Sequence, residues 1–251
     1  MKIGVQLYSL RNSLKNEKGY ETAFARLKNM GAEVVQVSGR LNIDSRRLGE
    51  LSREYGLPVC ISHVPFGRLE EEPEQLICEH KDFGCCNMGI GMMPAKYRTG
   101  KLKDIDLFVK FLNDTAELLK KEGMTLSYHN HWFEFDRTEG HVVMDYLIEN
   151  TSPQVMFIPD TFWIKVGGYA PEEYISKAAG RINTVHLKDY CKILGIPVFR
   201  AVGKGNLDFR SILDASQKAG AENAVIELDK SPSPYRSVGF GLNYINKLQI
   251  T

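Results

Sequence analysis

The sequence predicts a single-domain α/β protein, residues 1–251, folded as a closed (β/α)8 TIM barrel. Three observations predict this fold. Short β-type runs alternate with helical stretches from end to end, with no change of character that would mark a second domain. The chain holds eight such strand–helix units in 251 residues, the usual size of this barrel. A glycine suited to ending a helix precedes six of the strands, at Gly31, Gly56, Gly84, Gly123, Gly180 and Gly220.

The eight units follow one another in order. Their β-type runs are expected at residues 3–9, 34–38, 58–64, 85–91, 124–130, 154–160, 182–188 and 224–228. The helical stretches are expected near residues 20–30, 45–55, 70–83, 102–122, 142–150, 171–179, 209–219 and 235–247. A doubly wound open sheet is the alternative, but no G-x-G-x-x-G turn follows the first run, where residues 7–13 read LYSLRNS.

Composition excludes several classes of partner. With 32 basic and 31 acidic residues, the chain has no charge surplus to bind nucleic-acid backbones or anionic lipid, so neither nucleic acid nor membrane is expected as a partner. No apolar run approaches the roughly 20 residues that span a bilayer, and residues 1–10 do not resemble a secretory leader. Five cysteines without C-x-x-C spacing predict reduced core thiols in a cytoplasmic protein. The oligomeric state stays open, a homo-oligomer included.

Four consecutive late strands end on side chains that can bind a metal. They lead to His129, Asp160, His186 and Glu227. One such residue alone is more typical of a capping or hydrogen-bonded core position. Because the carboxyl ends of barrel strands meet at the mouth where chemistry takes place, four in succession indicate a shared site.

The chain resembles the xylose isomerase-like TIM barrels, which include sugar and inositol isomerases, ketose 3-epimerases, inosose dehydratase and, more distantly, endonuclease IV. The motifs that carry the resemblance are GVQLYSLR, SHVPF, YHNHWFEF, IPDTFW, VHLKD, VGKGNLDF and VIELD. The resemblance implies one divalent metal held at the ends of strands five to eight. Carried over by motif, the last three ligands are Asp160, His186 and Glu227.

The strand-five ligand departs from the epimerase pattern, which has a glutamate there. This chain has His129, as the inosose dehydratase-like branch does, and His131 is a rival because residues two apart face the same side of a strand. We favour His129. Two imidazoles and two carboxylates suit Mn, Zn, Co or Fe better than Mg or Ca.

Further polar residues surround these ligands. Glu134 has three interpretations: an acid that supports the ligands, a proton-transfer group, or a solvated loop charge. Lys188 either stabilises an anionic oxygen or lies on the surface. His63, at the end of the third strand, either contacts a substrate hydroxyl or is structural. His80 and His141 fall on or beside helices and are expected at the surface.

Aromatic residues lie close to the proposed ligands along the chain. Trp132 and Trp163 each come three residues after a ligand and suit the C–H faces of a sugar, although two core tryptophans are the alternative. His131 and Tyr8, which follows the first strand, are further substrate-binding candidates. Residues 203–205, Gly-Lys-Gly, lie where barrels often bind phosphate, but a flexible connector is the better interpretation.

These residues predict a metal-dependent isomerase or epimerase that acts on a sugar, keto-sugar or cyclitol through an enediolate. A lyase or dehydratase acting on a keto-sugar or keto-inositol is the close alternative, because His129 leaves Glu227 without the second glutamate that two-base epimerisation uses. An endonuclease IV-like nuclease would need more His and Glu ligands and a basic face. A non-catalytic sugar-binding barrel is the remaining alternative.

Overall fold

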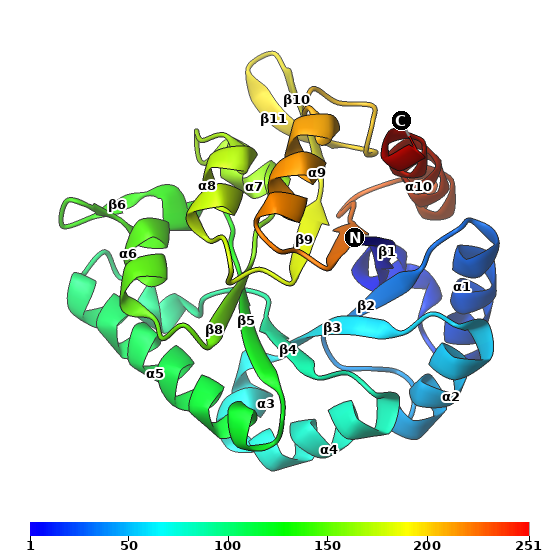
Figure 1. Cartoon of the computed structure of the whole chain (residues 1–251), viewed down its shortest axis with the longest axis horizontal. Coiled ribbons are helices and arrows are strands. Elements are labelled where there is room, and N and C mark those ends of the chain that lie inside the picture. Colours follow the sequence, from blue (N-terminus) through cyan, green and yellow to red (C-terminus); the bar gives the residue numbers. More distant parts are fainter. Residues whose placement is uncertain (251) are drawn as a thin grey trace.

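The computed structural model describes residues 1–250, and eight parallel strands form its central barrel (Figure 1). The strands are β1 (Lys2–Gln6), β2 (Val34–Ser38), β3 (Val59–Val64), β4 (Asn87–Ile90), β5 (Thr125–His129), β8 (Val155–Ile158), β9 (Thr184–Leu187) and β12 (Asn223–Ile226). Their order in the sheet is β8-β5-β4-β3-β2-β1-β12-β9, so each strand lies beside its neighbours along the barrel sequence. The predicted fold class is confirmed.

The barrel closes between β8 and β9 through sparse pairing. Two isolated parallel bridges join them, one between Phe157 and Ile182 and one between Asp160 and His186. The backbone N–H of His186 donates to the carbonyl of Pro159 at 2.9 Å. Two of the predicted ligands therefore lie opposite each other where the barrel closes.

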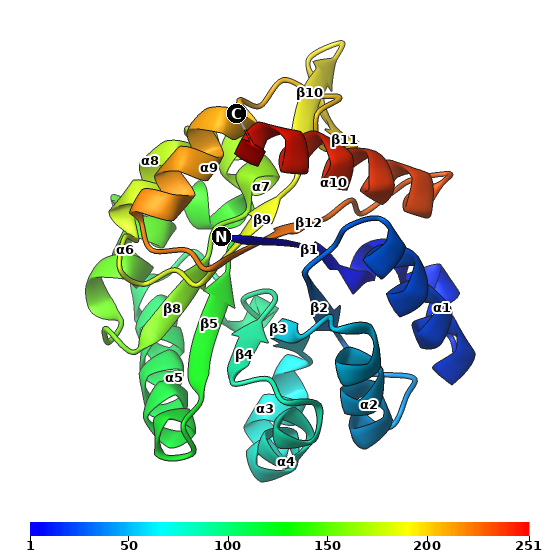
Figure 2. The same ribbon diagram turned by 45° about the vertical axis from the view of Figure 1, so that its right-hand side comes forward.

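Helices surround the barrel, and Figures 1 and 2 show them as an outer ring. Amphipathic faces supply buried residues that cover the strands, such as Phe108 and Leu112. The helices are α1 (Glu17–Asn29), α2 (Ser45–Tyr55), α3 (Phe66–Glu71), α4 (Pro73–Phe83), α5 (Leu102–Lys121), α6 (Val143–Asn150), α7 (Thr161–Val166), α8 (Pro171–Lys177), α9 (Phe209–Lys218) and α10 (Pro234–Ile250). All six glycines expected at helix ends have positive φ, as predicted.

The helix expected at residues 70–83 is two helices, α3 and α4. Pro73 has no N–H and restricts the residue before it, so Glu72 adopts an extended φ of −141° and α4 begins at the proline. Sequence analysis also missed α7, the 3-10 turns η1 (Leu7–Ser13), η2 (Ala95–Tyr97) and η3 (Phe133–Phe135), and two hairpins. The hairpins are β6 (Arg137–Thr138) with β7 (His141–Val142), and β10 (Asp189–Ile193) with β11 (Ile196–Arg200).

Two expectations about burial were wrong in part. His80 lies on α4 but is buried, because its Nε2 meets the hydroxyl of Ser62 on β3 at 2.6 Å and its Nδ1 donates to the carbonyl of Leu76. His141 is exposed, as predicted. All five cysteines are free thiols, yet Cys78 and Cys86 are exposed. No helix in the described part of the chain is long and apolar enough to cross a membrane.

Candidate metal and substrate site

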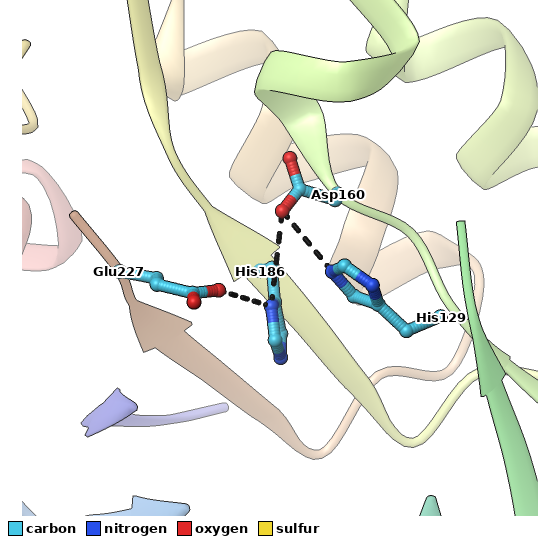
Figure 3. Close-up of side chains that lie close together, drawn as sticks. All are labelled: His129, Asp160, His186 and Glu227. Carbon is cyan, nitrogen blue, oxygen red and sulfur yellow. Dashed lines mark hydrogen bonds and ion pairs between the residues drawn. The ribbon is translucent and has the colours of Figure 1, made fainter. Parts of the chain in front are cut away.

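Four side chains at the carboxyl ends of successive strands converge at the mouth of the barrel (Figure 3). His129 ends β5, Asp160 follows β8, His186 lies on β9 and Glu227 follows β12. All four are buried, and one ligand atom from each lies within 4.8 Å of the others. The structure thus brings together the four residues that the sequence selected, and this set can hold a metal ion.

Hydrogen bonds to the far side of each imidazole fix which nitrogen faces this cluster. Nε2 of His186 donates to the amide oxygen of Gln36, on β2, at 2.7 Å, and this leaves the Nδ1 lone pair facing Glu227 Oε2 at 2.8 Å. Nδ1 of His129 donates to the carbonyl of Gly91 at 3.1 Å, and this leaves Nε2 facing Asp160 Oδ2 at 3.1 Å. Such outer hydrogen bonds are typical of metal-ligating histidines.

The two oxygens of the Asp160 carboxylate make different contacts. Its Oδ1 caps helix α7 by accepting the backbone N–H groups of Phe162 and Trp163, each at 3.0 Å. Its Oδ2 faces His129 Nε2 at 3.1 Å and His186 Nδ1 at 3.8 Å. The cap therefore holds the carboxylate so that one oxygen points into the cluster.

The donor chemistry of the cluster fits a divalent cation. With both imidazoles oriented as above, two nitrogen lone pairs and two carboxylate oxygens face one another. Nδ1 of His186 is buried and has no hydrogen-bond partner among the described residues. Acceptors crowded in this way need a shared cation or extra protons between them. His131 is not among the four residues whose ligand atoms converge, and its Nδ1 is buried without a hydrogen-bond partner among the described residues.

Lys188 is the cation of the site, and the surface interpretation of this residue was wrong. Its side chain is buried, and Nζ lies 3.0 Å from Asp229, 3.4 Å from Asp160 Oδ2 and 3.6 Å from Glu227 Oε2. Burial lowers the pKa of Lys188, but the three carboxylates outweigh burial and hold that pKa above its ordinary value. The lysine therefore stays an ammonium.

Lys188 lowers the pKa of both Glu227 and Asp229, but the net shifts of the two acids differ. Burial raises the pKa of Glu227, but Lys188 and His186 outweigh it, so that this pKa lies well below its usual range. Burial raises the pKa of Asp229 to about 6, with the nearby charge of Glu227 adding to the rise. Glu227 is consequently an ionised carboxylate at neutral pH.

His63 and His131 flank the cluster with their rings. The ring of His63 lies 5.0 Å from that of His129 and 5.2 Å from that of His186, and its Nε2 is buried without a partner among the described residues. Burial first, and the neighbouring histidines second, lower the pKa of His63 well below its ordinary value and that of His131 to about 3. Both are neutral imidazoles beside the site.

Glu134 is fully buried, so the interpretation as a solvated loop charge was wrong. It lies on η3 and accepts hydrogen bonds from the hydroxyl of Tyr128 and from the backbone N–H of His131, the latter at 2.7 Å. Burial raises its pKa to about 7. These bonds tie the loop after β5 to the strand that carries His129.

Aromatic side chains form one wall beside the cluster. Trp132 is 45% exposed, and its ring lies 5.0 Å from that of Trp163. Trp163 in turn lies 5.4 Å from the His131 ring, and Lys188 Nζ lies 5.3 Å from the Trp163 ring. The two tryptophans are thus neighbours at the mouth. The core interpretation does not apply to Trp132.

Tyr8 lies further out on the rim, 43% exposed on η1. The guanidinium of Arg11 stacks over its ring at 4.3 Å and donates to the backbone carbonyl of Asp229 at 2.6 Å. Asp229 is the residue that contacts Lys188. Tyr8 is therefore connected to the cluster through Arg11, Asp229 and Lys188.

The Gly-Lys-Gly segment at 203–205 surrounds an acid of this chain. The N–H groups of Gly203 and Gly205 donate to Asp189 Oδ2 at 2.9 and 2.7 Å. A side chain at position 205 would clash with that carboxylate, since a Cβ there would lie 2.3 Å from Asp189 Oδ1. The Asp189 carboxylate therefore already accepts the hydrogen bonds from the backbone N–H groups that a phosphate would need.

Comparison with known proteins shows the family of this chain. The model of the xylose isomerase-like TIM barrel family matches residues 24–237. The chain belongs to this family. The resemblance predicted from the sequence motifs is confirmed.

The chain is similar to several curated enzymes and solved structures. An inosose dehydratase of Geobacillus kaustophilus (strain HTA426) is 32% identical over 76% of this chain and 67% of that protein. The chain spans only about half the length of several other inosose dehydratases that it matches. A sugar phosphate isomerase/epimerase from Parabacteroides distasonis ATCC 8503 superposes with a TM-score of 0.83 at 23% identity, covering 98% of each chain. An IOLI protein with a bound zinc atom superposes with a TM-score of 0.73 at 13% identity, over 100% of this chain and 97% of that one.

Sequence analysis missed two residues that shape the site in this family member. Gln36 is a polar residue within an apolar strand, VVQVS, and that position was the available signal. Asp229 follows Glu227 by two residues, as Lys188 follows His186, and this shared spacing indicates a common side of the mouth.

Proposed function

We propose that this chain is a divalent-metal-dependent enzyme that removes a proton from the carbon beside a carbonyl of a sugar, keto-sugar or cyclitol. The observation that carries the proposal is the converging set of His129, Asp160, His186 and Glu227, with Lys188 beside it. A divalent ion of the Mn, Zn, Co or Fe type, when bound by these four residues, would act as a Lewis acid on a substrate oxygen.

The chain's own groups would supply the remaining chemistry. Glu227 is ionised and is the proposed base, because the Asp160 carboxylate is already committed to capping α7. Lys188 is a fixed ammonium 3.6 Å from Glu227 and would stabilise the enediolate oxygen that forms when the proton leaves. Neutral His63 offers an imidazole with an unpaired Nε2 to a substrate hydroxyl. Trp132 and Trp163 would pack against the C–H face of the ring.

Two outcomes share this first step, and two observations favour elimination. Returning the proton to carbon gives an isomer or epimer, whereas loss of a β-hydroxyl as water gives a dehydrated ketone. His129 stands where a second carboxylate base would be needed for epimerisation, and the 32%-identical relative is an inosose dehydratase. We therefore rank a dehydratase acting on a keto-cyclitol or keto-sugar above an isomerase or epimerase. A cytoplasmic location stays a prediction.

Deuterium exchange in D2O tests the proposal. Mn²⁺-loaded protein incubated with an inosose should place deuterium at the carbon beside the carbonyl, and an unsaturated ketone absorbing in the ultraviolet should appear if water is lost. Glu227→Gln should lower the exchange rate by about 10²–10⁴-fold, whereas Glu222→Gln, an exposed control just before β12, should leave it unchanged. Exchange that survives both Glu227→Gln and metal removal would refute the proposal. Efficient C3 epimerisation of free fructose or tagatose would refute the preference for elimination.

A further inference from the structure

An apolar cleft of about 490 Å³ opens at the carboxyl ends of β3 and β4, beside the proposed metal cluster. Its walls include Val64 at the end of β3 and Phe66 at the start of α3, together with Ile90 at the end of β4 and Met92 and Met93 after it. Arg98 is the one charged residue among the described residues that line it. Neither the mechanism nor the aromatic wall of the site accounts for this cleft.

Two lining residues join the cleft to the site. The carbonyl of Gly91 accepts the hydrogen bond that orients His129, and the ring of His63 lies 5.0 Å from that of His129. A Cβ at position 91 would lie 3.0 Å from His63 Nδ1, so a larger residue there would displace that ring. A substrate bound at the cluster would therefore have the cleft directly beside it.

The cleft is lined by both a packed aromatic residue and a flexible methionine. Phe66 packs against the rings of Tyr97, Phe108 and Phe111 at 6.1, 6.4 and 4.7 Å. Met92, which also lines the cleft, is 45% exposed, and an unbranched thioether adjusts to the shape of a ligand. These walls have few groups to pair with sugar hydroxyls, but they can bury apolar surface.

We propose that this cleft binds an apolar substituent, aryl or alkyl, carried by the sugar or cyclitol substrate. The natural substrate would then be a conjugated polyol rather than a free one. The inference rests on the proposed function, which places the polyol at the cluster. The contacts of His63 and Gly91 with His129 then place the cleft beside that polyol. The competing occupant is the apolar tip of the β10–β11 hairpin of a second copy, where Ile193, Leu194 and Ile196 are exposed.

Binding of phenyl β-glucoside and methyl β-glucoside to Mn²⁺-loaded protein labelled with [¹³C]methyl-methionine tests this inference. We expect the phenyl glucoside to bind at least about tenfold more tightly, with the Met92 methyl signal shifting only for that probe. Met92→Asp should remove most of this preference and leave the methyl glucoside unaffected, whereas Met92→Leu should keep it. Leu194→Asp, the matched control on the 97%-exposed hairpin residue, should change neither affinity.

Equal affinities for the two glucosides, or no binding of the phenyl glucoside, would overturn the inference. An equal effect of Leu194→Asp and Met92→Asp would also overturn it and would assign the cleft to a second copy's hairpin. Failure of the proposed function is distinguishable. If the proposed function alone fails, the preference for the phenyl glucoside persists while the inosose exchanges no deuterium. If this inference alone fails, exchange persists without any phenyl preference.

Discussion

Gln36 Oε1 accepts a hydrogen bond from His186 Nε2 at 2.7 Å, although their strands β2 and β9 are separated in the sheet by β1 and β12. This contact fixes the tautomer of the imidazole. With the proton on Nε2, the Nδ1 lone pair is directed at Asp160 and Glu227. A residue on β2 thus orients a member of the cluster on β9.

Gln36→Leu should weaken metal binding by about 10–100-fold, because it removes the acceptor that orients His186. The fold should persist, since leucine suits a buried strand position. Mn²⁺ affinity measured by calorimetry, with circular dichroism to check folding, tests this. Gln217→Leu, an exposed change on α9, serves as the control. Unaltered affinity in a folded Gln36→Leu protein would mean that the contact does not orient the ligand.

Lys188→Met should make the protein more dependent on metal for stability. Without the ammonium, three buried or half-buried carboxylates at Asp160, Glu227 and Asp229 lose their internal cation, a change that typically costs about 3–5 kcal/mol. We expect a lower Tm in EDTA and a larger rise of Tm on adding Mn²⁺ than in the unaltered chain. Lys165→Met, on the exposed side of α7, should show neither effect. An identical metal-induced rise in both variants would contradict this explanation.

Glu134→Gln should change how stability depends on pH. The pKa of Glu134 is about 7 in the folded chain against 4.5 ordinarily, because it is buried. As pH rises, the folded state therefore keeps this proton to a higher pH than the unfolded state does. The protonated Glu134 contributes its full stabilisation below pH 4.5, and this stabilisation is lost as pH rises to 7. Glutamine cannot ionise, so the variant should gain roughly 3 kcal/mol relative to the unaltered chain between pH 4.5 and pH 8. Urea unfolding at the two pH values measures this. A gain no larger than that of Glu117→Gln, an exposed control on α5, would show that Glu134 does not titrate as described.

Tryptophan emission should report substrate binding. Trp132 and Trp163 are in ring contact at the mouth, so a polyol packed against them should shift or quench the fluorescence. The change should shrink in both Trp132→Phe and Trp163→Phe. A ligand shown by calorimetry to be bound that leaves the emission unchanged would exclude the tryptophans from the substrate surface.

The barrel and the convergence of the four strand-end side chains could be predicted from the sequence because both depend on local patterns. Strand–helix alternation and helix-ending glycines determine the fold class, and a ligand at a strand end lies at the mouth of any such barrel. The sequence alone could not separate His129 from His131, because side chains two residues apart on a strand face the same side. In the structure β5 ends at His129, and only His129 belongs to the cluster.

What the sequence could not predict depends on contacts between distant segments. His80 was assigned to the surface because its partner, Ser62, lies on a strand 18 residues earlier. The orientation of Gln36 toward His186 spans 150 residues. The β10–β11 hairpin was missed because it is inserted between the seventh barrel strand and its helix, where strand–helix alternation predicts only a connecting loop.

The central claim is that His129, Asp160, His186 and Glu227 hold one divalent ion. Metal content per chain, measured by elemental analysis after Mn²⁺ loading and gel filtration, tests it most directly through His129→Ala and its matched neighbour His131→Ala. The account predicts one ion per chain in the unaltered protein and in His131→Ala, and loss of the ion in His129→Ala, Asp160→Ala and His186→Ala while circular dichroism stays unchanged. Equal metal content in all of these proteins, or loss in His131→Ala with retention in His129→Ala, would contradict it.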